Sequence, residues 1–423
     1  MLGSIGHNNN PVLTSSGPAP KLDILVVGSL AVDVACDYAP LPAESNRLSP
    51  RLHTSNPATV SHTVGGVAAN VARAAHLTGA NVKLCSMVGN DLAGKGAVDD
   101  LKSQGMDTSL IQVATDPQSR TAQYIAINDM EKNLVMAMSD MSILERAPDR
   151  CIEEVKSTLA TTTPAWVVFD ANWDPKTLRN MLNAARPTAA RVAFEPVSSA
   201  KAARLFAADS NRDIPVYPSP LVDLATPNAL ELLAMHTAAH ELELFERRDW
   251  FEVIDALGIP MSGLSTELSR ATSPALVSAG IPQQCIKLLP FIPCILTKLG
   301  ADGVLLVRVL PAGDARLSSA ASAPYLVARS RTGAHRVGGL MVRLFGAAEL
   351  VPQTDVVSVN GVGDTFLGAL LAGLVLSGNP RVEDFVDVAQ KASVLTLKSR
   401  NAVSPELTTL RSVRARDQGT GFQ

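Results

Sequence analysis

Short apolar runs alternate with segments of helical pattern along most of the chain. The run from Asp23 to Gly28 is almost continuously apolar and ends at a glycine, as is typical of a strand buried on both faces of a parallel sheet. Helices are expected at 66–78 and at 92–104, where Gly105 stops the second one. The order predicts an α/β fold, a three-layer α/β/α sandwich with a mostly parallel central sheet. Further strands are expected at 82–89, 165–170, 191–195, 215–217 and 294–297.

Three stretches interrupt this alternation. Residues 34–64 and 108–138 are less regular, and the second contains short strand patterns at 121–127 and 133–137 around an Asn-Asp turn. Both stretches are expected to form a small β lid over the main sheet. The stretch 236–289 is longer than a simple connection, so we interpret it as an insertion of helices joined by loops.

The ends of the chain differ in composition from its middle. Residues 1–20 combine an Asn run with Ser, Gly and Pro, which is typical of a disordered segment. One domain is expected over 21–410, and 411–423 is expected to be a tail.

Composition and charge exclude several classes of partner. The 423 residues are 46% hydrophobic and carry a formal net charge of −3, and only 4% are aromatic. This balance provides neither a basic field nor stacking platforms for nucleic acid. No apolar run reaches the roughly 20 residues of a membrane span, and the first twenty residues lack a targeting pattern. The five widely spaced cysteines indicate reduced thiols rather than a zinc site. We expect a cytoplasmic protein with small polar ligands.

The segment 357–373 is the strongest candidate for chemistry. A strand pattern leads into Gly361, Val362, Gly363 and Asp364, and a helix of small residues follows. Glycines at a helix start let backbone N–H groups close on an anion, and the helix dipole attracts negative charge. A carboxylate beside a phosphate is repelled by it, so a functional role must explain the position of Asp364. Taking a proton from an attacking hydroxyl would be such a role. The motif therefore predicts phosphoryl transfer.

A second glycine-rich loop enters the helix at 66–78. Gly65 and Gly66 permit close approach of a ligand to the backbone, and Asn70, one turn into the helix, can bond to hydroxyl groups. Taken alone, this pair of glycines is better explained as a tight turn that packs a helix on the sheet.

Three other patterns resemble known functional motifs but lack residues that those motifs require. The segment 89–96 nearly spells a P-loop, but Gly96 stands where that motif needs a hydroxyl for Mg²⁺. His236 and His240 share a helical face without the acid of a metalloprotease site. The motif at Gly361 lacks the third glycine and the downstream acid of a dinucleotide fingerprint.

Together, 65–89 and 360–373 resemble the two signatures of the ribokinase-like (PfkB) carbohydrate kinase family, and the resemblance covers about 22–410. It implies the ribokinase-like fold and ATP as co-substrate. It also implies that Asp364 is the catalytic base, that Gly361, Val362 and Gly363 supply an anion hole, and that Gly65, Gly66 and Asn70 bind the sugar hydroxyls.

Further positions match the family in the same order. Asp33 resembles the acid that grips two sugar hydroxyls. Asn228 and Glu231 resemble the N-x-x-E motif, whose acid organises water around Mg²⁺ near the phosphates. The segment 295–303 resembles the nucleotide-binding strand and loop, with Lys298 reaching the phosphates and two glycines admitting the nucleotide, Gly300 and Gly303.

Two departures narrow the implied function. Ser358 replaces an aspartate that often lies near a monovalent cation in the family, and Ala31 replaces an asparagine two residues before the diol acid. These departures weaken the expectation of potassium activation and of plain ribose as the substrate.

Within the family, four segments are similar to eukaryotic pseudouridine kinases, which often occur fused to a pseudouridine-5′-phosphate glycosidase. The resemblance implies phosphorylation of pseudouridine to pseudouridine 5′-phosphate, with a linked glycosidase as a partner; a homodimer is left open. Two alternatives stay open, another PfkB-type kinase acting on ribose, adenosine or a hexose, and a catalytically idle nucleoside-binding protein. The four segments are 139–144, 194–198, 226–233 and 357–364.

Overall fold

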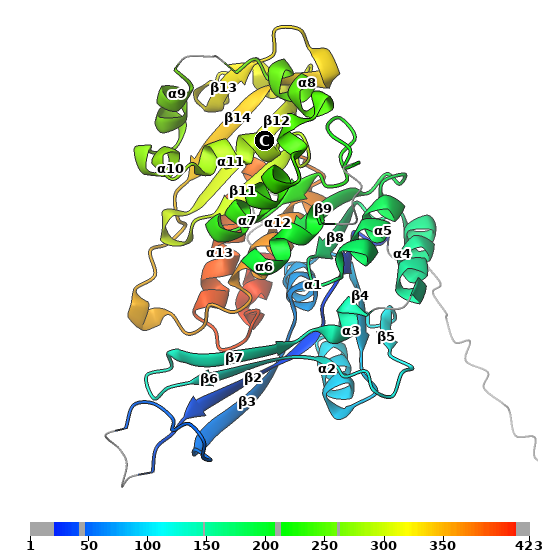
Figure 1. The fold of residues 1–423 in the computed structure, drawn as a ribbon, viewed down its shortest axis with the longest axis vertical. Coiled ribbons are helices and arrows are strands. Elements are labelled where there is room, and N and C mark those ends of the chain that lie inside the picture. The colour runs from blue at the N-terminus through cyan, green and yellow to red at the C-terminus, as the bar shows by residue number, and fades with distance from the viewer. Residues whose placement is uncertain (1–20, 42–46, 147–148, 208–212, 260–262, 412–423) are drawn as a thin grey trace, which may run out of the picture.

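A ten-stranded sheet forms the centre of the protein (Figure 1). The computed structural model describes residues 21–41, 47–146, 149–207, 213–259 and 263–411. The strand order is β13-β14-β12-β11-β10-β9-β8-β1-β4-β5; the strands from β5 to β11 are parallel to their neighbours, and β12, β14 and β13 pair antiparallel. The strands are β1 (Ile24–Val27), β4 (Val82–Val88), β5 (Ile111–Val113), β8 (Trp166–Asp170), β9 (Arg191–Glu195), β10 (Leu224–Ala225), β11 (Cys294–Lys298), β12 (Val304–Pro311), β13 (Leu326–Arg329) and β14 (Val337–Phe345).

Helices cover both faces of this sheet, so the expected three-layer sandwich is confirmed. On β1, Ile24 and Val26 belong to one buried cluster and Leu25 and Val27 to the other, as strand alternation requires. The first cluster is closed by α1 (Val67–Leu77), α2 (Leu92–Ser103), α12 (Val362–Ser377) and α13 (Val386–Leu397). The second is closed by α3 (Ser142–Glu145), α4 (Asp149–Thr162), α5 (Pro175–Ala185), α6 (Ser199–Ala202), α7 (Ala229–Glu241), α8 (Arg248–Ala256), α9 (Leu264–Ala271), α10 (Pro274–Ser278) and α11 (Ile281–Leu288).

A second, four-stranded sheet projects from one end of the molecule, at the bottom of Figure 1. Its order is β3-β2-β6-β7, with β2 and β6 parallel and the outer pairs antiparallel. We call it the lid sheet. The two short strands expected around an Asn-Asp turn are confirmed as β6 and β7, whereas β2 and β3 lie mostly in the stretch that looked irregular. Its strands are β2 (Ala31–Tyr38), β3 (Ala58–Gly65), β6 (Ala122–Asn128) and β7 (Leu134–Asp140).

The sequence prediction was wrong at three places in the main sheet. Residues 215–217 form no strand, because Pro215 and Pro218 remove backbone donors there, and the sheet position is taken by the short β10 instead. Strand β5 belongs to the main sheet although it lies within 108–138. Strands β12, β13 and β14 had not been predicted. The expected segment 1–20 and all of the expected tail 411–423 except Arg411 lie outside the described residues.

Helices α1 and α12 pack with their backbones unusually close. A Cβ atom on Gly368 of α12 would lie 2.5 Å from the carbonyl oxygen of Val71 and 2.7 Å from the Cβ of Ala74, both on α1. Only glycine fits this crossing, since real Cβ atoms do not approach backbone oxygens so closely. Among the described residues, each helix is too short or too polar to span a lipid bilayer.

Candidate active site

Asp364 lies in the first turn of α12, where the chain enters the helix through Gly361 with a φ of 72°. A Cβ on Gly361 would lie 1.9 Å from the carbonyl oxygen of Ala402, so a side chain at this position would be strained and would clash. No side chain of the described residues caps this helix start. Its N–H groups can therefore receive an anion, as the sequence motif predicts.

The side chain of Asp364 is held by Asn70 on α1. The Nδ2 atom of Asn70 donates a hydrogen bond of 2.9 Å to Oδ2 of Asp364. Burial raises the pKa of Asp364 to about 6, opposed by the bond from Asn70 and the charge of Lys298. The Oδ1 atom of Asn70 is buried and has no hydrogen-bond partner among the described residues, which leaves one acceptor available to a ligand hydroxyl.

Lys298, the last residue of β11, forms a buried ion pair with Glu195, the last residue of β9. The distance from Nζ of Lys298 to Oε1 of Glu195 is 3.0 Å, and the hydroxyl of Thr226 donates to Oε2 of Glu195. Burial raises the pKa of Glu195, and the charge of Lys298 opposes that rise. Burial lowers the pKa of Lys298, but Glu195 and Glu231 outweigh it and the net direction is upward. Lys298 therefore stays a cation at neutral pH.

Asn228 and Glu231 form a capping box at the start of α7. Asn228 Oδ1 accepts from the backbone N–H of Glu231, and Glu231 Oε2 accepts from the backbone N–H of Asn228 at 2.8 Å. The second carboxylate oxygen of Glu231 has no hydrogen-bond partner among the described residues. The backbone N–H of Lys298 donates to the carbonyl of Pro227, which places this helix start beside β11.

One cavity of about 720 Å³ brings most of the predicted site residues together. Glu195, which the sequence motifs had not indicated, also lines it. Gly363 faces Lys298 directly, because a Cβ on Gly363 would lie 2.8 Å from the Lys298 Nζ. Among the described residues, no three His, Cys, Asp or Glu side chains are grouped as a metal site. The predicted residues along the cavity are Asn228, Glu231, Lys298, Gly300, Gly303, Gly361, Val362, Gly363 and Asp364.

Asp33, Gly65 and Gly66 lie on the lid side of Asn70 and do not line that cavity. The Asp33 carboxylate rests on Gly65, whose Cβ would lie 2.3 Å from Oδ2 of Asp33. Gly66 has a φ of 92° and no room for a Cβ beside the Ser29 carbonyl. Burial raises the pKa of Asp33 to about 6, and the charge of Arg73 opposes the rise. Asn70 is thus the link between the two groups of predicted residues.

Asp170 is a second residue that motif reasoning missed. It ends β8, and its Oδ2 accepts from the backbone N–H and hydroxyl of Ser29 at 2.8 and 2.7 Å and from the N–H of Ala68 at 3.2 Å. This carboxylate fastens the loop after β1 to the start of α1. Asp170 and Glu195 both stand at carboxyl ends of parallel strands, the edge where open α/β sheets bind ligands; that position was the available signal.

The patterns rejected from the sequence have other uses in the structure. The start of α2 is capped by Asp91, whose Oδ1 accepts from the N–H of Gly94 at 2.8 Å. His236 packs against Phe245 with 5.1 Å between ring centroids. All five cysteines are free thiols. The Ser358 hydroxyl accepts from the N–H of Asn360 at 3.1 Å.

Comparison with known proteins agrees with this architecture. Residues 21–254 and 345–409 match the sequence profile described as pfkB family carbohydrate kinase. Over 402 residues the chain is 30% identical to a pseudouridine-metabolizing bifunctional protein of Schizosaccharomyces pombe. The aligned region covers 94% of this chain and 48% of that protein. Over 120 residues it is 28% identical to the pseudouridine kinase of Escherichia coli. That aligned region covers 28% of this chain and 35% of the Escherichia coli protein. The chain thus spans about half of the first relative and about a third of the second.

A solved structure shows the same fold. The ribokinase of Cryptococcus neoformans in complex with ADP superimposes with a TM-score of 0.59 at 18% identity, over 93% of this chain and 99% of that chain. The match with the family profile extends over more than half of the sequence and includes both Asn70 and Asp364. This chain therefore belongs to the pfkB family of carbohydrate kinases.

Proposed function

We propose that this chain is an ATP-dependent kinase that phosphorylates a hydroxyl group of a sugar or nucleoside, with pseudouridine as its acceptor. The observation that carries the proposal is the position of Asp364. It is a buried carboxylate in an uncapped helix start, it lines a cavity with Lys298, and Asn70 holds it from the lid side. A carboxylate between an anion-binding helix end and a hydroxyl-binding loop is suited to deprotonate an acceptor.

The chemical step follows from these positions. The acceptor hydroxyl would lose its proton to Asp364 while its oxygen attacks the γ-phosphorus of ATP. The bond from the γ-phosphorus to the oxygen bridging to the β-phosphate breaks, and ADP leaves with that electron pair. Because the pKa of Asp364 is raised to about 6, the group is unprotonated at pH 7 yet basic enough to take the proton.

The negative charge of the transferring group needs stabilisation from fixed donors. The N–H groups at Gly361, Val362 and Gly363 would supply it, together with the positive end of the α12 dipole. Lys298 would add a full charge beside Gly363. Its ion pair with Glu195 keeps Lys298 oriented when no phosphate is bound.

Magnesium is expected with the nucleotide, and the residues present fit it. Glu231 and Asp364 both raise the pKa of Glu195, so these carboxylates form a local excess of negative charge that a divalent cation would relieve. With no group of three ligating side chains among the described residues, most ligands would come from phosphate and water, as Mg²⁺ prefers. Glu231 would hold such a water through its free oxygen. The bound ion would neutralise charge on the phosphates.

Asp33 and Asn70 would bind the acceptor. A carboxylate can accept from both hydroxyls of a vicinal diol, and Asn70 offers its unpaired Oδ1. Closure of the lid segments 34–64 and 108–138 would exclude water, which otherwise competes as acceptor for the γ-phosphate. Pseudouridine is supported by the two relatives whose names refer to it. A linked glycosidase and a homodimer remain predictions; light scattering on the purified chain tests the latter.

An acceptor panel tests the proposal. The purified protein is incubated with labelled ATP, Mg²⁺ and pseudouridine, uridine, adenosine, ribose or a hexose, and kcat/KM is compared. Pseudouridine should be preferred, with phosphate appearing on its 5′ oxygen, while 5′-deoxypseudouridine should bind without being phosphorylated. Preference for another acceptor would retain the kinase and replace the substrate. Saturable nucleoside binding without transfer to any acceptor would contradict the kinase itself.

A further inference from the structure

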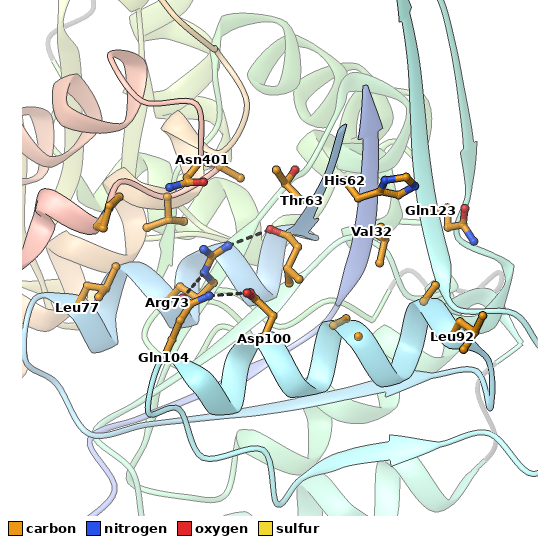
Figure 2. Close-up of a pocket in the computed structure, with 17 residues that line it drawn as sticks. Val32, His62, Thr63, Arg73, Leu77, Leu92, Asp100, Gln104, Gln123 and Asn401 are labelled. Atoms are coloured by element: carbon orange, nitrogen blue, oxygen red, sulfur yellow. Dashed lines mark hydrogen bonds between the residues drawn. The ribbon is translucent and has the colours of Figure 1, made fainter. Parts of the chain in front are cut away.

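Arg73 is a buried cation that the proposed reaction does not use. It lies on α1 one turn beyond Asn70, with 7% of its surface exposed, and it borders a second cavity of about 830 Å³ behind the lid sheet (Figure 2). Among the described residues, no carboxylate lies within ion-pair distance of its guanidinium. Buried guanidinium groups are usually paired, so its placement requires an explanation.

Hydrogen bonds hold this guanidinium in one orientation. Its Nε donates to Oε1 of Gln104 at 3.0 Å, and one terminal nitrogen donates to the carbonyl oxygen of Val64 at 2.9 Å. The amide of Gln104 in turn donates to Oδ2 of Asp100 at 2.6 Å. Figure 2 shows Arg73, Gln104 and Asp100 in this arrangement between α1 and α2. The side chain therefore ties the end of β3 to both helices.

Val64 lies next to the glycine loop of Gly65 and Gly66, which we call the acceptor loop because it is proposed to bind the acceptor. Val64 precedes Gly65, and the carboxylate of Asp33 rests on Gly65 within 2.3–2.8 Å of where a Cβ would be. Val32 pairs with Val64 across β2 and β3, so a shift of Val64 would move the strand that carries Asp33. Arg73 also affects Asp33 electrostatically, because its charge opposes the rise that burial causes in the pKa of Asp33.

We propose that Arg73 is a positioning residue for the acceptor: its guanidinium fixes the end of β3 and stabilises the Asp33 carboxylate that would accept hydroxyls of the acceptor. This inference rests on the proposed role of Asp33 in the kinase reaction. It assigns to Arg73 an effect on acceptor binding that is separate from nucleotide binding and from phosphoryl transfer.

The other groups around Asp33 do not replace this charge. In the lid sheet, Asp33 stands opposite Thr63 on β3 and Tyr124 on β6, neither of which is cationic. On the far side of Arg73, Asp100 of α2 raises the pKa of the guanidinium, as Asp33 also does, whereas burial lowers it. The charge of Arg73 thus acts on two carboxylates beyond ion-pair distance, and one of them, Asp33, is the proposed acceptor ligand.

The test compares Arg73→Gln, which removes the charge, with Arg73→Lys, which keeps it. Acceptor affinity is measured by calorimetry without ATP between pH 5 and 8 in an Asp364→Asn background, which also lowers turnover strongly. Kinetics are measured in the otherwise unchanged protein. In the Arg73→Gln protein, the pH below which acceptor affinity is lost should rise. For a rise of one pKa unit at Asp33, the dissociation constant of the acceptor should increase about tenfold at pH 5 and about twofold at pH 7, where about half of the carboxylate is still ionised. The kcat and the nucleotide KM should stay within about threefold of their original values, because the substitution changes the environment of Asp33 and not that of the proposed nucleotide site. The Arg73→Lys protein should keep the original pH dependence.

Two controls separate this role from a general loss of structure. Arg179, a partly buried arginine on α5 that donates to the carbonyl of Leu205, provides Arg179→Gln, which should leave the acceptor KM unchanged. In an Asp33→Asn background, Arg73→Gln should have no further effect on the pH dependence. If Arg73→Gln does not fold, Gln104→Glu sets a carboxylate against the guanidinium without removing it, and should produce the same upward shift.

The inference is overturned if acceptor affinity and its pH dependence are unchanged in Arg73→Gln or Gln104→Glu, or if nucleotide and acceptor binding decline together. These outcomes leave the proposed function intact as long as the unmodified protein transfers phosphate. An unmodified protein that binds and phosphorylates none of the acceptors would instead contradict the proposed function, and with it this inference.

Discussion

Asn70 and Asp364, which are 294 positions apart in the sequence, are joined by a hydrogen bond of 2.9 Å from amide to carboxylate. The bond connects the helix that follows the acceptor loop to the helix start proposed to receive phosphate. Because the oxygen of the same amide has no hydrogen-bond partner in the described part of the chain, Asn70 would be able to contact an acceptor while it orients Asp364, the proposed base.

The first prediction concerns the base. Asp364→Asn should lower kcat by roughly two to four orders of magnitude, the usual contribution of general acid–base catalysis, and should leave nucleotide affinity nearly intact. A coupled ADP assay and calorimetry with ATP measure the two effects. The matched control is Asp387→Asn, the same change at an exposed aspartate paired with Lys391, which should retain full activity. A variant at Asp364 with most of its activity would refute the assigned role.

The second prediction concerns pH. The hydrogen bond from Asn70 lowers the pKa of Asp364, which burial raises to about 6. Asn70→Ala should therefore raise that pKa, and because the base must be unprotonated, the acidic limb of kcat at saturating acceptor should move to higher pH. Rates at pH 6 should fall more than rates at pH 8. Asn379→Ala, which removes a similar bond to exposed Asp384, should leave the limb in place; an unmoved limb in Asn70→Ala would count against this coupling.

The third prediction concerns the pair of Lys298 and Glu195. Lys298→Met leaves a carboxylate buried without its partner and should lower the free energy of unfolding by about 3–5 kcal/mol. The double variant Glu195→Gln/Lys298→Met removes both charges and should lose less than the sum of the single changes. Urea unfolding of the original protein, Lys298→Met, Glu195→Gln and the double variant gives this coupling energy. Strictly additive losses would show that the two residues do not stabilise each other.

The fourth prediction separates two glycines of one motif. Gly361→Ala forces an unfavourable φ and a clash with the backbone of Ala402, so it should destabilise the fold by at least about 1–2 kcal/mol. Gly363→Ala meets only the flexible end of Lys298, so the protein should fold normally and bind nucleotide more weakly. Thermal unfolding and the ATP KM measure the two effects. Equal loss of stability in both variants would be inconsistent with this difference.

Continuous apolar strands were sufficient to predict the sandwich, and the glycine motif was sufficient to single out Asp364. Lys298 and Glu231 were expected only from the resemblance to the family, and the structure places all three along one cavity. Both signals are local in sequence, since burial on two faces leaves an apolar run and a helix start needs its glycines. Glu195 was missed because a single acid at a strand end has no distinguishing neighbours, and its importance comes from Lys298, 103 positions away.

The errors in the predicted fold also arise where structure depends on residues far apart in the sequence. Strand β10 is only two residues long and is defined by its neighbours β9 and β11, so no pattern within it could indicate a strand. Strands β2 and β3 show neither strict alternation nor a continuous apolar run, and most of their residues are only partly buried or exposed. Their pattern is therefore a weaker signal than that of the buried strands of a parallel sheet. Long-range pairing, rather than local preference, determines these elements.

The contact of Gly368 with Val71 makes the spacing between the two halves of the site a property of the backbone. Neither α1 nor α12 can be moved closer, and a single added methyl group would push Asn70 away from Asp364 without altering either residue. Changes in the lid sheet could therefore vary which hydroxyl compound the proposed acceptor site holds, while the distance from that site to Asp364, the proposed base, is maintained by a position where the chain carries no side chain at all.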